Sequence, residues 1–414
     1  MMLCEKIKES FGRRRRKLFA DYTFFISDKI SKIDLEAWQK VNSGNNLFLS
    51  PDYLNLLEIS EDENYHFRYV IVYEKKTPVA ISYFQVIDFS AALFGEMVSG
   101  QLSSMQSKRA KLFQTYLEKT KGQVVLRLVT LGNNFVSGEH GVAFAKDISK
   151  ENQFALINKL SEIISKEEKL HGRISATLVK DFYSNSLPVN NELKEQSFLE
   201  FGVEPNMVIE LPEKVKSIAD YLALFSKKYR NRAKNIFKLS EAIEKRELTA
   251  AEIVKLNGKI FALYEQVYNN AKFKLVKLHK NYFVDAKKVF EEKFVVVGFF
   301  LDNKLVAFNS AFLLENGELE AHFIGFEYSI NKEYELYQNM LYNLVDTAIK
   351  NKKQRINLGR TAAEIKSTVG AKAEELTCYV KPQNTVSKMV MSPFLNFLRP
   401  SEWVPRNPFK EEMV

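Results

Sequence analysis

A twelve-residue pattern occurs twice in this chain of 414 residues. Residues 140–151 read HGVAFAKDISKE and residues 322–333 read HFIGFEYSINKE, with five identical positions at an offset of 182 residues. The same offset places Arg173 and Ile174 on Arg355 and Ile356. The repeat predicts that one structural unit is encoded twice, which strongly constrains the fold.

Each copy predicts a strand, a helix and a second strand. The pattern opens with a short apolar, β-prone stretch. Ser149 and Asn331 then stand where a helix N-cap belongs, and a Glu two positions later favours the positive end of a helix dipole. After residues at helical spacing, ISATLV (174–179) and INLG (356–359) predict the second strand. A helical crossover of this length favours parallel neighbouring strands.

The domain layout follows from the length and the repeat. A chain of 414 residues exceeds one typical core, so two domains are expected. The sequence predicts a mixed α/β fold in which each half carries helices, a hairpin and the repeated crossover. Helices are also expected over residues 104–120 and 191–202. The expected segments are a basic tail (1–20), a first domain (21–212), a second domain (213–385) and a Pro-rich, aromatic tail (386–414).

Composition limits the class of protein and its partners. The 60 Lys and Arg exceed the 51 Asp and Glu, which favours an anionic partner such as a thioester cofactor, tRNA or a lipid surface. Cys4 and Cys378 form neither a metal motif nor a disulfide framework, so we expect no metal and a reducing compartment. No apolar stretch is long enough to span a bilayer. A cytoplasmic protein is expected.

Two terminal segments keep membrane association open. Residues 13–17 read RRRRK and could attract lipid headgroups or nucleic acid phosphates, or form a solvated tail. Residues 387–409 are apolar and aromatic but contain four prolines. They could lie on a membrane or wrap the fold. Peripheral association with the inner membrane is therefore a hypothesis that the sequence leaves undecided.

Two stretches carry a family resemblance. LFSKKYRNRAKNIFKLS (224–240) resembles a basic helix of Fem-like proteins, and INLGRTAAEIKSTVGAKAEEL (356–376) resembles a segment of GNAT-like proteins. The order of elements and its duplication resemble tandem GNAT acyltransferases of the Fem-like branch. The resemblance implies two GNAT-like domains and transfer of an acyl group from a thioester or ester onto an amine. The donor would be an acyl-CoA or another thioester, or an aminoacyl-tRNA.

The turn before each crossover helix departs from that family. Acetyltransferases bind the coenzyme A pyrophosphate on a glycine-containing turn at this helix. Here the turns read KDISKEN and EYSINKEYE, without glycine and with acidic residues. Three functions stay open: N-acyl transfer to a lipid or cell-envelope amine, Fem-type aminoacyl transfer from tRNA to a peptidoglycan precursor, and a non-catalytic binding module.

The resemblance directs attention to groups for proton transfer and oxyanion binding. His322 and Glu320 share one face of a predicted strand, and an imidazole that titrates near neutrality suits deprotonation of an ammonium. Tyr337 on the crossover helix is the candidate proton donor, and backbone near Gly325 could bind the carbonyl. A hydrogen-bonded strand histidine and a packing tyrosine are the structural alternatives.

A second set of residues is expected to bind the donor. INLG delivers Arg360 to the carboxyl end of a strand, where α/β sheets usually bind ligands. Guanidinium and ammonium groups there bind phosphate or carboxylate, although a salt bridge to Glu364 or Glu374 is the alternative. The full expected set is Arg360, Thr361, Lys366, Asn309 on the hairpin, and Lys228 and Arg232 on the basic helix.

Overall fold

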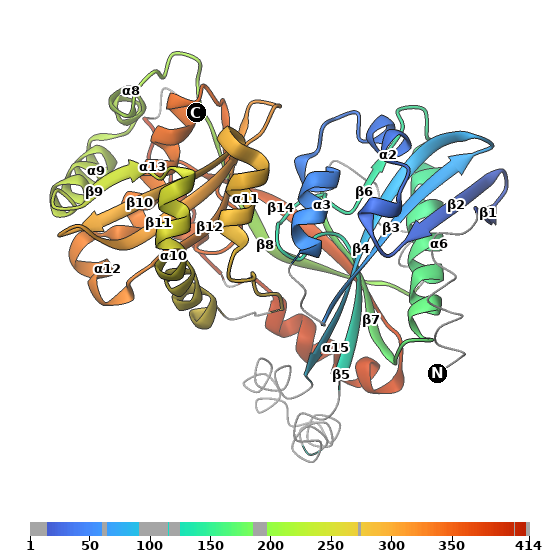
Figure 1. Ribbon diagram of the computed structural model, residues 1–414. Coiled ribbons are helices and arrows are strands. Elements are labelled where there is room, and N and C mark those ends of the chain that lie inside the picture. Colours follow the sequence, from blue (N-terminus) through green and yellow to red (C-terminus); the bar gives the residue numbers. More distant parts are fainter. Residues whose placement is uncertain are drawn as a thin grey trace. The chain divides into compact units, whose positions relative to one another are not determined.

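The structure is a computed structural model that describes residues 15–59, 64–90, 115, 125–184, 197–271, 275–400 and 402–410. The chain forms two compact units (Figure 1). Unit 1 comprises Met1–Val203 and Glu375–Pro400, and unit 2 comprises Glu204–Glu374 and Ser401–Val414. Each unit is therefore built from two separate segments of the chain. The expected division at residue 212 differs from this one, because the last strand of each half is built into the other unit.

Unit 1 is a sheet with helices on both faces. Strands β1 to β5 are antiparallel neighbours in chain order, β7 lies parallel to β5, and β14 is antiparallel to β7. Its strands are β1 (Arg16–Phe19), β2 (Tyr22–Ser27), β3 (Tyr65–Glu74), β4 (Thr77–Ser90), β5 (Val125–Leu131), β6 (Val142–Phe144), β7 (Ile174–Tyr183) and β14 (Lys372–Pro382). Its α-helices are α2 (Leu35–Val41), α3 (Pro51–Glu58), α6 (Lys150–Glu168) and α15 (Thr385–Leu398).

Neighbouring residues of β3 show how the helices of unit 1 are layered. The Tyr69 ring packs on Trp38 of α2, with 6.1 Å between ring centroids. Val70 belongs instead to the apolar cluster that contains Phe154 and Ile157 of α6. Since successive side chains of a strand point to opposite faces, α2 and α6 cover opposite faces of the sheet.

Unit 2 repeats this arrangement with a hairpin, a strand, a crossover helix and a parallel strand. Its sheet has the order β9, β10, β11, β12, β13, β8, and only the pair β12–β13 is parallel among these strands. Its strands are β8 (Leu199–Glu210), β9 (Glu244–Glu247), β10 (Phe294–Leu301), β11 (Lys304–Leu313), β12 (Glu318–Phe326) and β13 (Arg355–Asn357). Its α-helices are α8 (Ile218–Ala223), α9 (Lys227–Leu239), α10 (Ala250–Asn270), α11 (Tyr282–Phe290), α12 (Tyr328–Tyr334), α13 (Leu336–Lys350) and α14 (Ala363–Thr368).

The layers of unit 2 are also set by alternation along one strand. The Phe308 ring contacts Phe283 of α11 at a centroid distance of 5.0 Å. The side chain of Asn309 donates to the Met340 carbonyl of α13 at 3.2 Å. Helices α11 and α13 therefore cover opposite faces, as α2 and α6 do in unit 1.

Strand registers confirm the duplication. In unit 1, β4 pairs Ser82 with Val142, and in unit 2, β11 pairs Asn309 with Ile324. Val142 and Ile324 are separated by the same 182 residues as the repeated pattern. The hairpin strand and the strand of the repeated pattern thus pair in one register in both units. Two units of one mixed α/β fold explain why the pattern appears twice.

Three local expectations are corrected. Ser149 caps α6 by accepting the Asn152 N–H, as expected, but Asn331 lies inside α12. The second crossover helix, α13, starts only after Glu335, whose left-handed φ of 47° separates the two helices. In unit 1, β7 lies parallel to β5 and not to the strand of the repeated pattern, because β6 pairs antiparallel with β4.

The predicted helix over residues 191–202 is wrong where the structure describes it, since residues 199–202 begin β8. The continuous burial of residues 205–209 and the pairing of residues 208–210 with β13 indicate that the sheet outweighs the local helical pattern there. The predicted helix over residues 104–120 lies outside the described residues, Thr115 apart.

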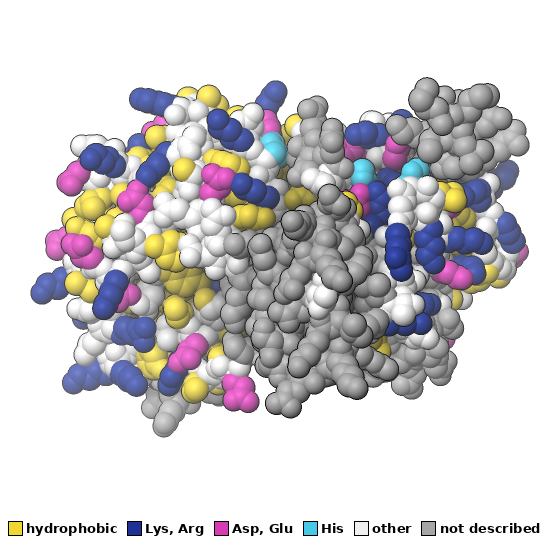
Figure 2. Space-filling view, turned by 90° about the horizontal axis from the view of Figure 1, so that it is seen from below, with side chains coloured by type: hydrophobic (Ala, Val, Ile, Leu, Met, Phe, Trp, Pro, Cys, Tyr) yellow, Lys and Arg dark blue, Asp and Glu magenta, His cyan; other side chains and the backbone are white. Residues whose placement is uncertain are grey.

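The expected tails are partly folded. Residues 16–19 form β1, and Arg16 pairs with Glu167 at 2.6 Å. Residues 385–398 form α15, and Phe409 packs on Phe225 with 5.3 Å between ring centroids. On the face drawn in Figure 2, Lys and Arg side chains are interspersed with acidic ones. Within the described residues, no helix is long and apolar enough to cross a membrane.

Candidate active site

Glu320 is a buried carboxyl on the parallel strand pair of unit 2. It lies opposite Asn357 of β13 and Phe312 of β11, and it is 4% exposed. Burial raises the pKa of Glu320 well above its ordinary value, and the nearby Glu318 carboxylate adds to the rise. A hydrogen bond with Asn357 opposes the shift. A carboxyl with a raised pKa is suited to proton transfer near neutral pH.

His322 lies on the same strand but in an aromatic enclosure. Its Nε2 atom forms a 2.6 Å hydrogen bond with the Tyr282 hydroxyl of α11. The ring also contacts Phe323 and Phe312, with centroid distances of 4.4 and 4.9 Å. Burial lowers the pKa of His322 to about 3. The expectation that this imidazole titrates near neutrality is therefore wrong, and the ring is neutral at pH 7.

Lys366 is held by backbone oxygens. The residue is 4% exposed, and its ammonium donates to the carbonyls of Leu358, Gly359 and Arg360 at 2.7, 3.0 and 2.5 Å. Burial lowers the pKa of Lys366 to about 7. Because its nitrogen lies within hydrogen-bond distance of three backbone carbonyls, this side chain positions a turn instead of reaching a ligand.

The turn that Lys366 holds has an uncommon backbone. Gly359, Thr361 and Ala362 have positive φ values of 69°, 67° and 50°. A β-branched residue such as Thr361 seldom adopts this conformation, and the strain persists only where the surroundings enforce it. The turn presents Arg360, which is half-buried, and Thr361, which is exposed. Of the two acidic residues considered as partners of Arg360, Glu364 pairs with Arg406 and Glu374 pairs with Arg355.

Ser310 closes the β-bulge between β11 and β12, which lies two residues after Glu320 along β12. Ser310 of β11 lies opposite residues 322 and 323, and its hydroxyl accepts the Phe323 N–H at 3.1 Å.

Gly325, the expected carbonyl-binding region, lies under α10 instead. A Cβ at Gly325 would approach the Tyr264 backbone nitrogen to 2.6 Å. The glycine is therefore required for close packing of helix on strand.

The remaining candidates lie around the crossover helix α13. The side-chain amide of Asn309 forms a second hydrogen bond with this helix, donating to Asn343 at 3.0 Å. Arg232 of α9 donates to Gln338 of α13 at 2.9 Å. Lys228 is exposed on α9. The Tyr337 ring packs near Phe326, with 6.0 Å between centroids, and burial raises the pKa of the Tyr337 hydroxyl. The structure thus brings Glu320, His322 and Asn357 onto one strand pair but leaves Tyr337, Lys228 and Arg232 on other elements.

The start of α13 does not fit a coenzyme A pyrophosphate. The Tyr337 N–H is already bonded to Asn331 at 2.9 Å, and the Glu335 carboxylate accepts from Gln338. Helix α12 stands where a glycine turn would be needed. A phosphate at this point would therefore meet an engaged amide and a carboxylate.

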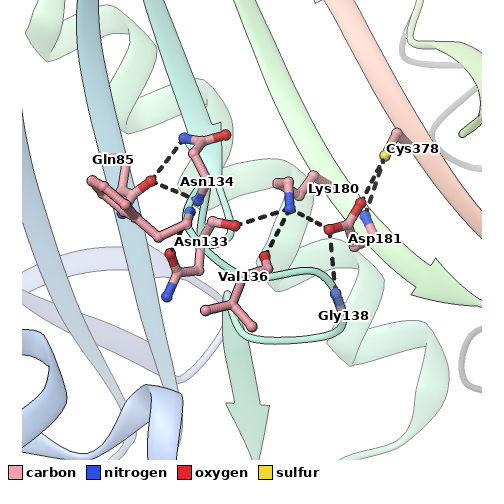
Figure 3. Close-up of polar contacts among 9 residues, drawn as sticks. Gln85, Asn133, Asn134, Val136, Gly138, Lys180, Asp181 and Cys378 are labelled. Carbon is pink, nitrogen blue, oxygen red and sulfur yellow. Dashed lines mark hydrogen bonds and ion pairs between the residues drawn. The ribbon is translucent and has the colours of Figure 1, made fainter. Parts of the chain in front are cut away.

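In unit 1, the position equivalent to the Glu320 site is filled by a loop, residues 132–141. Tyr83 of β4 lies opposite residues 132–141, whereas its counterpart Ser310 faces only two residues. Lys180 donates to the carbonyls of Asn133 and Val136 at 2.9 and 3.2 Å and pairs with Asp181 (Figure 3). These contacts fasten the loop to β7.

Asp181 links that loop to two strands (Figure 3). The residue is fully buried at a φ of 66°, accepts the Gly138 N–H at 3.2 Å, and lies 3.3 Å from the Cys378 sulfur of β14. His140 packs on Phe48 at a centroid distance of 4.6 Å, and burial, followed by the charge of Lys180, lowers the pKa of His140 to about 4. Both repeated histidines are therefore half-buried, and burial lowers the pKa of each.

Sequence reasoning missed Tyr282, Asn357 and the pair Lys180–Asp181. Adjacent charges inside the apolar strand ISATLVKDFY were a visible signal for that pair. The contact of Tyr282 with His322 joins residues 40 positions apart and has no local signature. In the described part of the chain, no group of three or more His, Cys, Asp or Glu side chains could bind a metal ion.

Comparisons with known proteins identify the fold. No protein-family model matches the chain, and no curated protein matches it. A solved tandem GNAT protein from the clavulanic acid biosynthesis pathway is similar over 88% of this chain and 99% of its own, with a TM-score of 0.52 and 6% identity. The C-terminal domain of a putative lysylphosphatidylglycerol synthetase from Agrobacterium fabrum covers 87% of this chain and 94% of its own, with a TM-score of 0.46 and 10% identity. A GCN5-related N-acetyltransferase from Sphaerobacter thermophilus covers 89% and 98%, with a TM-score of 0.44 and 9% identity. The chain thus has the tandem GNAT fold.

Proposed function

We propose that this chain is an N-acyltransferase that moves an acyl group from an activated ester or thioester to an amine. The fold is that of tandem GNAT proteins, and acyl transfer is the chemistry that this resemblance implies. The observation that carries the proposal is Glu320, a buried carboxyl with a raised pKa on the parallel strand pair of unit 2. Unit 2 is the catalytic unit, because the equivalent place in unit 1 is filled by residues 132–141.

Glu320 accepts the proton that the amine must lose. The amine nitrogen attacks the donor carbonyl carbon, a C–N bond forms, and the C–S or C–O bond of the donor breaks. The ammonium proton passes to Glu320 and leaves with the thiol or alcohol. A carboxylate held in a site that disfavours its charge is a stronger base than one in water. Asn357 orients Glu320, and neutral His322 supplies an aromatic wall.

Arg360 and Thr361 bind an anionic part of the donor. Both stand on the turn that Lys366 holds in a left-handed conformation, directly after β13. A preorganised turn loses little entropy when a ligand binds. Guanidinium groups bind phosphate or carboxylate in a bidentate manner. The acceptor is an amine-bearing lipid or cell-envelope precursor, at the cytoplasmic face of the inner membrane.

A second candidate is aminoacyl transfer from tRNA to a peptidoglycan precursor. The observation that favours it is the start of α13, where an engaged amide and Glu335 do not fit a pyrophosphate. A donor that carries no coenzyme A would avoid this conflict. The two candidates share the chemistry at Glu320 and differ in the donor and in the range of acceptors.

The proposal is tested by complementing a deletion strain with variant chains. Lipid and muropeptide profiles are recorded for the wild type, Glu320→Gln and Glu327→Gln. Glu327 follows the same strand but pairs with Lys259, so its substitution controls for the loss of a carboxylate. The expected result is an N-acyl lipid or a cross-bridge that the wild type and Glu327→Gln restore and Glu320→Gln does not.

Donor identity is tested separately by thermal shift. Stabilisation by acyl-CoA esters supports the first candidate, and stabilisation by aminoacyl-tRNA supports the second. Restoration by Glu320→Gln, with no stabilisation by any donor, would refute acyl transfer. It would indicate a binding module instead.

A further inference from the structure

Helix α9 carries an uncommon concentration of positive charge. Its thirteen residues, KKYRNRAKNIFKL, include six Lys or Arg and no acidic residue. The helix lies beside α8 at one edge of unit 2 (Figure 1). Its first turn contains Lys227, Lys228 and Arg230 and no acid, and Ser226 makes no capping hydrogen bond through its side chain. Cations at the positive end of a helix are unfavourable.

One stripe of α9 points to solvent. Lys227, Lys234 and Lys238 are all exposed and lie on one side of the helix, at spacings of seven and four residues. Ala233 and Ile236, on the opposite side, are buried in the core of unit 2. The lysine stripe is therefore not needed to attach the helix to its unit.

The exposed charges receive no compensation within the described residues. None of the three lysines forms an ion pair there. Lys234 and Lys238 are like charges one helical turn apart, which destabilises a helix. Residues that lower the stability of a helix and make no compensating contact in the folded protein indicate a function.

We infer that the lysine stripe of α9 docks on an anionic lipid bilayer. Lysine suits a diffuse negative surface, whereas planar arginine suits bidentate recognition of individual phosphates. One exposed apolar side chain stands next to the stripe, since Leu239, which is 42% exposed, follows Lys238. A basic face beside an exposed apolar group matches a headgroup layer.

This docking surface is a third candidate beside the two that the sequence suggested. Arg15 lies over the Tyr73 ring at 3.4 Å and Arg16 pairs with Glu167, so both have partners inside unit 1. The C-terminal residues 402–410 pack on unit 2 through Phe409. The inference deepens the proposed function, because a lipid or envelope acceptor would lie at such a surface.

The test measures vesicle binding of the full chain without substrate. Phosphatidylcholine vesicles are compared with vesicles that also contain phosphatidylglycerol, at low and high salt. The test variant is Lys227→Gln/Lys234→Gln/Lys238→Gln. The matched control is Lys255→Gln/Lys304→Gln/Lys372→Gln, which removes three exposed lysines from α10, β11 and β14. Circular dichroism confirms that both variants fold.

The wild type and the control should bind only the anionic vesicles, and added salt should weaken that binding. The test variant should bind roughly 100-fold more weakly. Absence of binding by the wild type, or equal losses in both variants, would overturn the inference. Salt-sensitive binding of tRNA that depends on the α9 lysines, without vesicle binding, would assign the surface to RNA. Because no substrate is present, each outcome is independent of acyl transfer.

Discussion

Substitution of Lys366 by methionine tests the buried clamp on the turn after β13. Methionine keeps an unbranched side chain of similar length but cannot donate to the carbonyls of Leu358, Gly359 and Arg360. A neutral amine can donate two of these hydrogen bonds, and their loss at a residue that is 4% exposed should lower the free energy of unfolding by about 2 kcal/mol. The turn should then sample other conformations, since its left-handed residues no longer have an anchor.

The lowered pKa of Lys366 sets the direction in which the stability of the wild type changes with pH. Burial lowers the pKa of Lys366 from 10.5 to about 7 in the folded state. Between these values the unfolded chain binds the proton and the folded chain does not, so the wild type gains stability as the pH rises through this window. The gain is lost progressively as the pH falls from the unfolded value to the folded one. Its slope is at most about 1.4 kcal/mol per pH unit.

Urea unfolding of both proteins at several pH values within this window measures the difference directly. The stability gap between the wild type and Lys366→Met should widen with pH, while other titrating groups cancel in the comparison. A gap that stays constant would refute the reasoning. It would mean that the three carbonyls keep the ammonium charged and that burial does not lower its pKa.

Three further predictions follow from the packing. Gly325→Ala should destabilise unit 2 by about 3 kcal/mol, because its Cβ would meet the α10 backbone, whereas Gly258→Ala on α10 meets nothing within 4 Å and should stabilise by about 0.5–1 kcal/mol in urea unfolding. The His322 ring, with a pKa of about 3, should show no NMR titration at neutral pH, and a midpoint near 6.5 would contradict its enclosure. Asp181→Asn should cost about 3–5 kcal/mol, because Lys180 would lose its buried partner. Glu162→Gln, at an exposed pair with Lys159, should change the unfolding free energy by less than about 1 kcal/mol, and similar losses at both sites would refute the assignment.

Several local features were predictable because their causes are local. Ser149 caps α6 with its own side chain, and the apolar spacing that follows defines the buried face of that helix. The repeat located both crossover helices, since duplication preserves the order of elements. Asn331 is not the N-cap residue of the second crossover helix, because it lies inside α12, but its side chain still accepts the Tyr337 N–H in the first turn of α13.

The site was harder to predict because its chemistry depends on long-range contacts. His322 was expected to titrate near neutrality, but aromatic rings from β11 and from its own strand, with Tyr282 of α11, enclose it. Lys366 was expected to bind a ligand, but backbone carbonyls six to eight residues earlier fold back onto its ammonium. Sequence patterns report which residues are polar, not which atoms their polar groups reach.

The sequence by itself determined that one mixed α/β unit is encoded twice, because periodicity, capping and β-prone runs act over a few residues and recur at a constant offset. The tertiary structure alone decided which candidate groups keep a protonation state useful for chemistry. That outcome depends on desolvation and on partners distant in the chain. Glu320 therefore emerges as the proposed base, and the histidines that mark the repeat do not.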